Sequence, residues 1–185
     1  LLSQGAEGLI LDLRGNGGGL LTEALEMGGL FVPKGTKVVE TKGRAPQSAR
    51  TYSTNRAPIL PELPLVVMVD EQSASASEIV SGALQDLDRA VIVGNRTFGK
   101  GLVQSTRPLP YNGTLKLTTS KYYIPSGRCI QKVDYAARRN GTDDKKTADN
   151  GADFFHAAEL DGSVRPPVPA DNNELRAVTM DFTIE

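Results

Sequence analysis

The fold depends on one junction, Leu63-Pro64-Leu65-Val66-Val67-Met68-Val69-Asp70 followed by Glu71-Gln72-Ser73-Ala74-Ser75-Ala76-Ser77-Glu78-Ile79. The first run is almost entirely apolar, which is typical of a strand buried on both faces. From Ser75 onward the apolar residues change to helical spacing. They are Ile79, Ala83, Leu84 and Leu87. The junction therefore predicts an interior strand followed by a helix that begins near Ser75.

The same strand–turn–helix order occurs earlier in the chain. Residues 8–13 form a short apolar run that ends at a glycine-rich turn, residues 15–19, and residues 21–28 have helical spacing. Residues 90–94 form a third apolar run of the interior type. Alternation of such strands with helices predicts an α/β fold.

The remaining segments predict antiparallel strands and loops. Residues 36–41 alternate weakly as a strand, and the proline-containing stretch 43–61 is expected to be an exposed loop. Residues 102–109 and 115–124 both resemble strands, and Asn112-Gly113 between them is a strong hairpin signal. The sheet is therefore expected to be mixed, with a β-hairpin.

Length and composition are those of one soluble globular domain, and we expect residues 1–185 to form it. A formal net charge of −1, without a basic stripe, argues against nucleic acid as a partner. The polar stretch 133–153 is expected to be a flexible excursion, and residues 175–184 a closing strand. Because the chain starts without Met and reaches a strand by Leu9, we expect a fragment of a longer protein.

The chain contains one cysteine and one histidine. An intrachain disulfide and a cysteine- or histidine-rich metal site are therefore excluded, and no metal or cofactor is expected. Cys129 is expected to be a small buried residue. His156 follows Phe154-Phe155 without a carboxylate pattern to orient it, so we expect a surface or packing residue.

Ser75 and Lys100 are a candidate nucleophile and general base for acyl transfer. A hydroxyl attacks well only when a base takes its proton, and a lysine is such a base only when desolvation keeps it neutral. Lys100 lies between Gly99 and Gly101, which permit the close backbone approach that would bury an amine. Gln104 follows four residues later and is a candidate to orient that amine.

A purely structural interpretation stands beside this one. Ser75 and Glu78 have the spacing of a capping box, and Lys100 would then be an inert lysine in a turn. The spacing alone leaves both interpretations open.

The glycine turn of residues 15–19 is a candidate anion site, because backbone amides at a helix N-terminus attract negative charge. In an acyl-transfer enzyme the anion is the tetrahedral oxyanion, and the amides of Gly18 and Ala76 are the candidate donors. The alternatives are a turn that needs positive φ and a phosphate cradle. Leu20 stands where a dinucleotide-binding loop has its third glycine, which argues against the phosphate cradle.

Four motifs in order resemble the carboxy-terminal processing peptidases, or tail-specific proteases. They are Leu11-Asp12-Leu13-Arg14-Gly15-Asn16-Gly17-Gly18-Gly19, Ser73-Ala74-Ser75-Ala76-Ser77-Glu78-Ile79, Phe98-Gly99-Lys100-Gly101-Leu102-Val103-Gln104, and residues 115–123 with Pro125-Ser126-Gly127-Arg128. The resemblance covers about residues 8–131. Residues 160–171 match the family pattern only loosely, and no PDZ-like stretch is present.

The resemblance implies a Clp protease/crotonase-like α/β core and serine endopeptidase activity near the C-termini of protein or peptide substrates. By position, Ser75 would be the nucleophile, Lys100 the general base and Gln104 the residue that orients it, with Gly18 and Ala76 as oxyanion donors. Family members are typically exported, so a periplasmic or other extracytoplasmic location is expected. A non-catalytic binding module and an acyl-thioester enzyme on the same fold are the alternatives.

Overall fold

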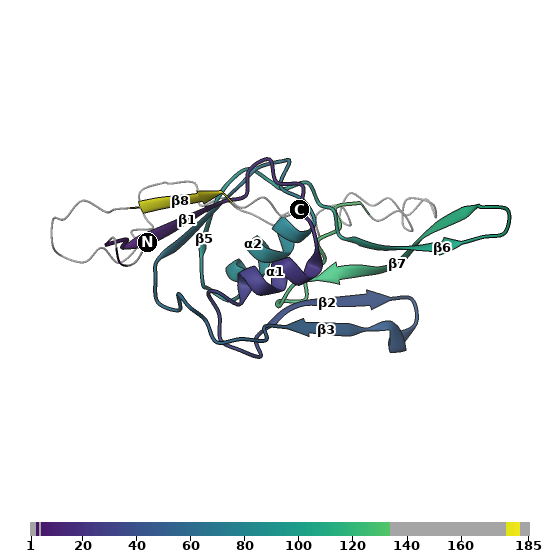
Figure 1. The fold of residues 1–185 in the computed structure, drawn as a ribbon, viewed down its shortest axis with the longest axis horizontal. Coiled ribbons are helices and arrows are strands. Elements are labelled where there is room, and N and C mark those ends of the chain that lie inside the picture. The colour runs from purple at the N-terminus through teal and green to yellow at the C-terminus, as the bar shows by residue number, and fades with distance from the viewer. Residues whose placement is uncertain (1–2, 4, 134–176, 182–185) are drawn as a thin grey trace.

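The structure, a computed structural model, describes residue 3, residues 5–133 and residues 177–181. Its strands form two four-stranded sheets, and the helices α1 (Leu21–Gly28) and α2 (Ala76–Asp86) lie between them (Figure 1). Helix α2 contacts α1 and one strand of each sheet. In the part of the chain described, no helix is long and apolar enough to cross a bilayer.

The first sheet is wholly parallel and has the strand order β5-β4-β1-β8. Its strands are β5 (Val91–Gly94), β4 (Leu65–Val69), β1 (Gly8–Asp12) and β8 (Ala177–Asp181). The three interior strands predicted from apolar runs are therefore confirmed. The predicted closing strand is confirmed over residues 177–181, where it pairs with β1.

The second sheet is antiparallel and has the strand order β3-β2-β7-β6. Its strands are β3 (Arg50–Ser53), β2 (Lys37–Gly43), β7 (Thr114–Tyr123) and β6 (Leu102–Pro108). The predicted α/β class with parallel and antiparallel strands is confirmed, but the two kinds of strand lie in separate sheets. The pairing of β2 with β7, which joins the two halves of this sheet, links segments distant in sequence, so local pattern does not reveal this division.

The loop predicted for residues 43–61 is wrong in part. The stretch contains a 3₁₀ turn, η2 (Pro46–Ser48), and the strand β3, which pairs with β2. Only Tyr52 of β3 is even half-buried, so the strand has almost no alternation of apolar and polar residues. Its conformation is imposed by backbone pairing with β2 rather than by a buried face.

The predicted hairpin is confirmed, with its turn one residue earlier than the Asn-Gly signal suggests. Tyr111 and Asn112 have φ of 60° and 58°, and the Gly113 N–H donates to the Pro110 carbonyl oxygen at 3.3 Å. Positive φ at both central residues is the mirror-image turn that matches the twist of paired strands. Tyr111 therefore takes a conformation that usually belongs to Gly or Asn.

The core is apolar and lies where the helices meet both sheets. Its largest side chains with under 2% exposure include Leu11, Leu13, Ile79, Leu84, Ile124 and Ile130. Cys129 is half-buried rather than buried. His156 and, apart from Val133, the predicted excursion at 133–153 lie outside the described residues.

Candidate active site

Three parallel strands end side by side, β1 at Asp12, β4 at Val69 and β5 at Gly94. The segment after β1 carries Gly18, the segment after β4 carries Ser75 and Ala76, and the segment after β5 carries Lys100. Ligands of parallel α/β sheets bind at the carboxyl ends of the strands. The topology thus brings every predicted site residue except Gln104 to one edge of the sheet.

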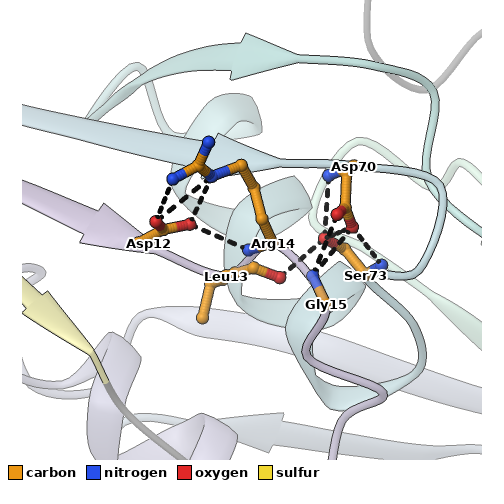
Figure 2. A network of polar contacts seen from close by, with 6 residues as sticks. All are labelled: Asp12, Leu13, Arg14, Gly15, Asp70 and Ser73. Atoms are coloured by element: carbon orange, nitrogen blue, oxygen red, sulfur yellow. Dashed lines mark hydrogen bonds and ion pairs between the residues drawn. The ribbon is translucent and has the colours of Figure 1, made fainter.

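Asp70 fastens the glycine turn to the segment that leads to Ser75 (Figure 2). Its carboxylate accepts the Gly15 N–H at 2.9 Å and the N–H groups of Gln72 and Ser73, both at 3.0 Å. The fully buried Ser73 hydroxyl accepts the Asp70 N–H at 2.9 Å and donates to the Leu13 carbonyl oxygen at 2.7 Å. The turns after β1 and β4 are therefore held as one unit.

These hydrogen bonds determine the ionisation of Asp70. Burial by itself would raise the pKa of the Asp70 carboxyl, but the hydrogen bonds from Gly15, Gln72 and Ser73 outweigh it. The pKa of Asp70 is therefore below its ordinary value, and the turn is built around a charged carboxylate.

Asp12 and Arg14 form a second, more exposed pair beside this unit (Figure 2). The Arg14 Nε and Nη2 atoms donate to the two Asp12 oxygens at 2.9 Å and 2.6 Å. These side-chain hydrogen bonds lower the pKa of Asp12 from its ordinary value. The planar two-point contact stiffens the exit of the chain from β1.

Ser75 has an unusual backbone conformation, with φ of 56° and ψ of −113°. Positive φ in a residue with a side chain costs free energy and is concentrated at functional sites. Ser75 and Glu78 are arranged as a capping box, in which the Ser75 N–H donates to Glu78 Oε2 at 2.8 Å. The half-buried Ser75 hydroxyl is on the side of the helix amides but makes no cap hydrogen bond of standard geometry. Both halves of the capping box are present, so the Ser75 side chain faces the Glu78 N–H while the Glu78 carboxylate binds the Ser75 N–H.

Glu78 joins the start of α2 to the segment that carries Lys100. Its side chain is 1% exposed, and Oε2 accepts the Ser75 N–H and the Lys100 N–H, each at 2.8 Å. Its other oxygen accepts the Gly99 N–H at 2.6 Å and the Thr97 hydroxyl at 2.7 Å. Because one oxygen atom binds both amides, the backbone nitrogens of Ser75 and Lys100 are close neighbours. The sequence indicated Glu78 only as a capping residue and contained no signal for this wider role.

The two glycines beside Lys100 allow the close approach that the sequence predicted. A Cβ on Gly99, which has φ of +85°, would lie 2.3 Å from Lys132 Cβ, and one on Gly101 would lie 2.3 Å from the Gln131 nitrogen. The Lys132 N–H donates to the Gly99 carbonyl oxygen at 3.1 Å. The backbone around Lys100 is therefore packed between Glu78 and residues 131–132.

The side chains of Lys100 and Gln104 are not engaged in the way the sequence suggested. Lys100 is exposed, and its amine has no hydrogen bond to Ser75 or to any other described residue. Phe98, two residues earlier, is itself 56% exposed and does not cover it. Gln104 is an exposed residue of β6 at a register shift and does not bond Lys100. The structure thus brings the backbones of Ser75 and Lys100 together without showing contact between their side chains.

Gly18 and Ala76 meet as the sequence predicted, in a crowded arrangement. A Cβ on Gly18, which has φ of +87°, would lie 2.4 Å from the Ala74 carbonyl oxygen and 2.7 Å from the Ala76 nitrogen. The Gly18 N–H donates to Asn16 Oδ1 at 2.9 Å, whereas the Ala76 N–H has no acceptor among the residues described. The Ala76 N–H therefore has no acceptor among the described residues, whereas the Gly18 N–H is bonded within its own turn.

Known proteins match the part of the chain that carries the candidate site. The profile of peptidase family S41 matches residues 1–137. A carboxy-terminal-processing protease of Bartonella bacilliformis is 46% identical over 127 residues, which are 69% of this chain and 29% of that protein. The chloroplastic carboxyl-terminal-processing peptidase 1 of Arabidopsis thaliana is 43% identical over 126 residues, covering 68% of this chain and 26% of that protein.

A solved structure shows the same fold. The photosystem II D1 C-terminal processing protease has a TM-score of 0.65 and 38% identity, covering 70% of this chain and 33% of that one. The predicted Clp protease/crotonase-like α/β class is confirmed by this similarity. The chain spans about a third or less of each of these relatives.

Removing the charge of Asp70 is expected to change how stability depends on pH. A carboxyl whose pKa is lowered on folding stabilises the protein above its unfolded pKa of about 3.9, and this contribution is lost as the pH falls through the folded pKa. Asp70→Asn should therefore lower the free energy of unfolding by about 1.5–3 kcal/mol near neutral pH and by less in acid. Urea denaturation from neutral to acidic pH measures this difference. Glu7→Gln, at an exposed carboxylate, is the control, and a difference that is constant with pH would contradict the assignment.

Two neighbouring glycines provide a matched test of the crowded turn. Gly18→Ala should destabilise the protein, because its Cβ would collide with the Ala74 carbonyl oxygen and its φ is positive. Gly17→Ala should have little effect, because no atom lies within 4 Å of the Cβ position. Thermal unfolding of both variants measures the contrast, and equal stability losses would refute this account of the turn.

Proposed function

This chain belongs to peptidase family S41, and we propose that it is the core of a serine endopeptidase that cleaves protein substrates near their C-termini. The observation that carries the proposal is the Glu78 carboxylate, one oxygen of which binds the amides of both Ser75 and Lys100. That contact puts a strained serine and a lysine together at the carboxyl edge of the parallel sheet. The relatives named as carboxy-terminal-processing proteases support the substrate class.

In the proposed reaction, Ser75 Oγ attacks the carbonyl carbon of the scissile peptide bond while the neutral Lys100 amine takes its proton. The oxyanion of the tetrahedral intermediate is stabilised by the Ala76 N–H and by the Gly18 N–H. When the intermediate collapses, the C–N bond breaks and the leaving amine takes the proton from Lys100. Water then attacks the Ser75 ester, with Lys100 again as the base, and this releases the carboxylate product and the free serine.

Two features of the structure have to change for this reaction. The Lys100 side chain is exposed and does not contact Ser75, so it must turn toward Ser75 and be covered before it acts as a base. Gly18 must exchange its hydrogen bond with Asn16 for one to the substrate oxygen. We propose that bound polypeptide supplies both changes, with Gln104 orienting the amine once Lys100 turns toward Ser75.

The proposal extends to the setting of the enzyme. The substrates are proteins or peptides with exposed C-termini, and the chemistry uses no cofactor. The location is periplasmic or otherwise extracytoplasmic, in keeping with the exported members of the family.

The competing function is a non-catalytic binding module on the same fold. The exposed Lys100 side chain, unbonded to Ser75, is the observation that favours it. A binding module would keep the clustered backbones without needing a reactive hydroxyl.

Substitution of the proposed pair separates the two functions. In the full-length protein, Ser75→Ala and Lys100→Ala should each lower the cleavage rate of a peptide by at least about a thousandfold, because a nucleophile and its base act as a unit. Lys116→Ala, at another exposed lysine, should cleave normally. Mass spectrometry of the products locates the cleavage site. Normal turnover by Lys100→Ala would refute the proposed mechanism.

Glu78 is proposed as a positioning residue for the same reaction. Glu78→Gln replaces one acceptor oxygen by an NH₂ group, so the two donors bonded to that oxygen lose their partner. We expect a lower kcat with a KM changed less, and a loss of stability of at least about 1–3 kcal/mol. Kinetics below the melting temperature separate the two effects. An unchanged kcat in the folded variant would show that the carboxylate is needed only for stability.

A further inference from the structure

The hairpin of β6 and β7 extends beyond the helices and the rest of the fold (Figure 1). We call residues 104–118 the arm. From residue 106 to residue 118, every residue except Gly113 is exposed, on both faces of the strands. A two-stranded hairpin without a covered face has little to stabilise it in water. An arm of this kind is suited to bind a surface outside the described fold.

One face of the arm carries three leucines together with Arg107 and Ser105. Arg107 pairs with Leu115 and Ser105 pairs with Leu117, so these side chains share a face, and Leu109 lies two residues from Arg107 on the same side. The three leucines are 40–47% exposed. The opposite face carries polar side chains, among them Thr106, Thr114, Lys116 and Thr118. The arm is therefore amphipathic, and its leucine face is uncovered by the described residues.

The tip of the arm presents an aromatic side chain to the outside. Tyr111 is 102% exposed and is held at φ of 60° by the turn. A tyrosine combines an apolar ring with a polar hydroxyl, and this combination is favoured at membrane–water interfaces.

The arm carries only positive charges. The sequence has no acidic residue between Asp88 and Asp134, although the whole chain has a net charge of −1. Arg107 and Lys116 are exposed cations three residues from the ends of the turn at Pro110 and Gly113, which is about 10 Å at a rise of about 3.4 Å per residue. Headgroup phosphates lie at about that depth when an apolar tip enters the boundary between headgroups and acyl chains.

We propose that the arm docks on a membrane surface containing anionic lipids, with Tyr111, Leu109 and Leu115 at the headgroup–acyl boundary and with Arg107 and Lys116 on the phosphates. Pairing of the arm with a second copy is disfavoured, because two cationic arms repel and Pro108 interrupts the open edge of β6. A lipid surface accommodates the leucines, the aromatic tip and the cations together. The docking does not depend on peptide hydrolysis.

Flotation of the full-length protein with lipid vesicles tests the proposal. We expect binding to vesicles of phosphatidylcholine mixed with phosphatidylglycerol, weak binding to phosphatidylcholine alone, and a loss of binding as salt is added. Arg107→Glu with Lys116→Glu should weaken binding at least about tenfold, because two cations attracted to the anionic surface are replaced by two anions that it repels. Tyr111→Ser with Leu115→Ser should also weaken it. Both double variants should cleave a soluble peptide at the normal rate.

Lys34→Glu with Lys37→Glu is the charge-matched control. Lys37 is the first residue of β2 and Lys34 precedes it, at the end of the strand opposite the turn to β3. Equal losses in the control and in the arm variants would overturn the proposal, as would equal binding to neutral vesicles or none to either. Loss of stability or of a dimer in the arm variants, without vesicle binding, would show that protein covers the arm and would also overturn it.

Discussion

The hydrogen bonds of the buried Glu78 carboxylate are the interaction on which the candidate site depends. A charge at 1% exposure is costly unless its oxygens are fully bonded, and here four donors bind it. The donors come from Ser75 at the start of α2 and from Thr97, Gly99 and Lys100 after β5. The first turn of a helix also favours negative charge. The segments of Ser75 and Lys100 are therefore not free to separate while this carboxylate stays buried.

The glycine turn after β1 is held by Asp70 and Asn16, separately from the contacts of Glu78. Asp70 binds the Gly15 amide, and Asn16 binds the Gly18 amide through its side chain and the Ala74 amide through its carbonyl oxygen. Asp70 reaches the glycine turn through its side chain, and Asn16 reaches the segment before α2 through its backbone carbonyl oxygen. The carboxyl edge of the parallel sheet is thus assembled from three loops by polar contacts, with the apolar core beneath them. This division leaves the Ala76 N–H without an acceptor among the described residues, while neighbouring amides are occupied.

Much of the fold was predictable, because its signals are local. The apolar runs of β1, β4 and β5, the helical spacing of α2 and the turn between β6 and β7 all predicted the elements that the structure contains. Strand β3 was missed because pairing with β2, rather than a buried face, makes it a strand. The meeting of Gly18 with Ala76 could be anticipated, whereas the exposure of Lys100 could not, since burial depends on what packs over a loop.

The sequence by itself determined most of the secondary structure, the family and most of the candidate site residues. It did so because strand and helix periodicity, turn glycines and ordered motifs are properties of neighbours along the chain. The tertiary structure alone decided the division into two sheets, the wider role of Glu78 and the engaged Gly18 amide. These depend on groups many residues apart, such as Glu78 and Lys100, and on the need of every buried polar atom for a partner.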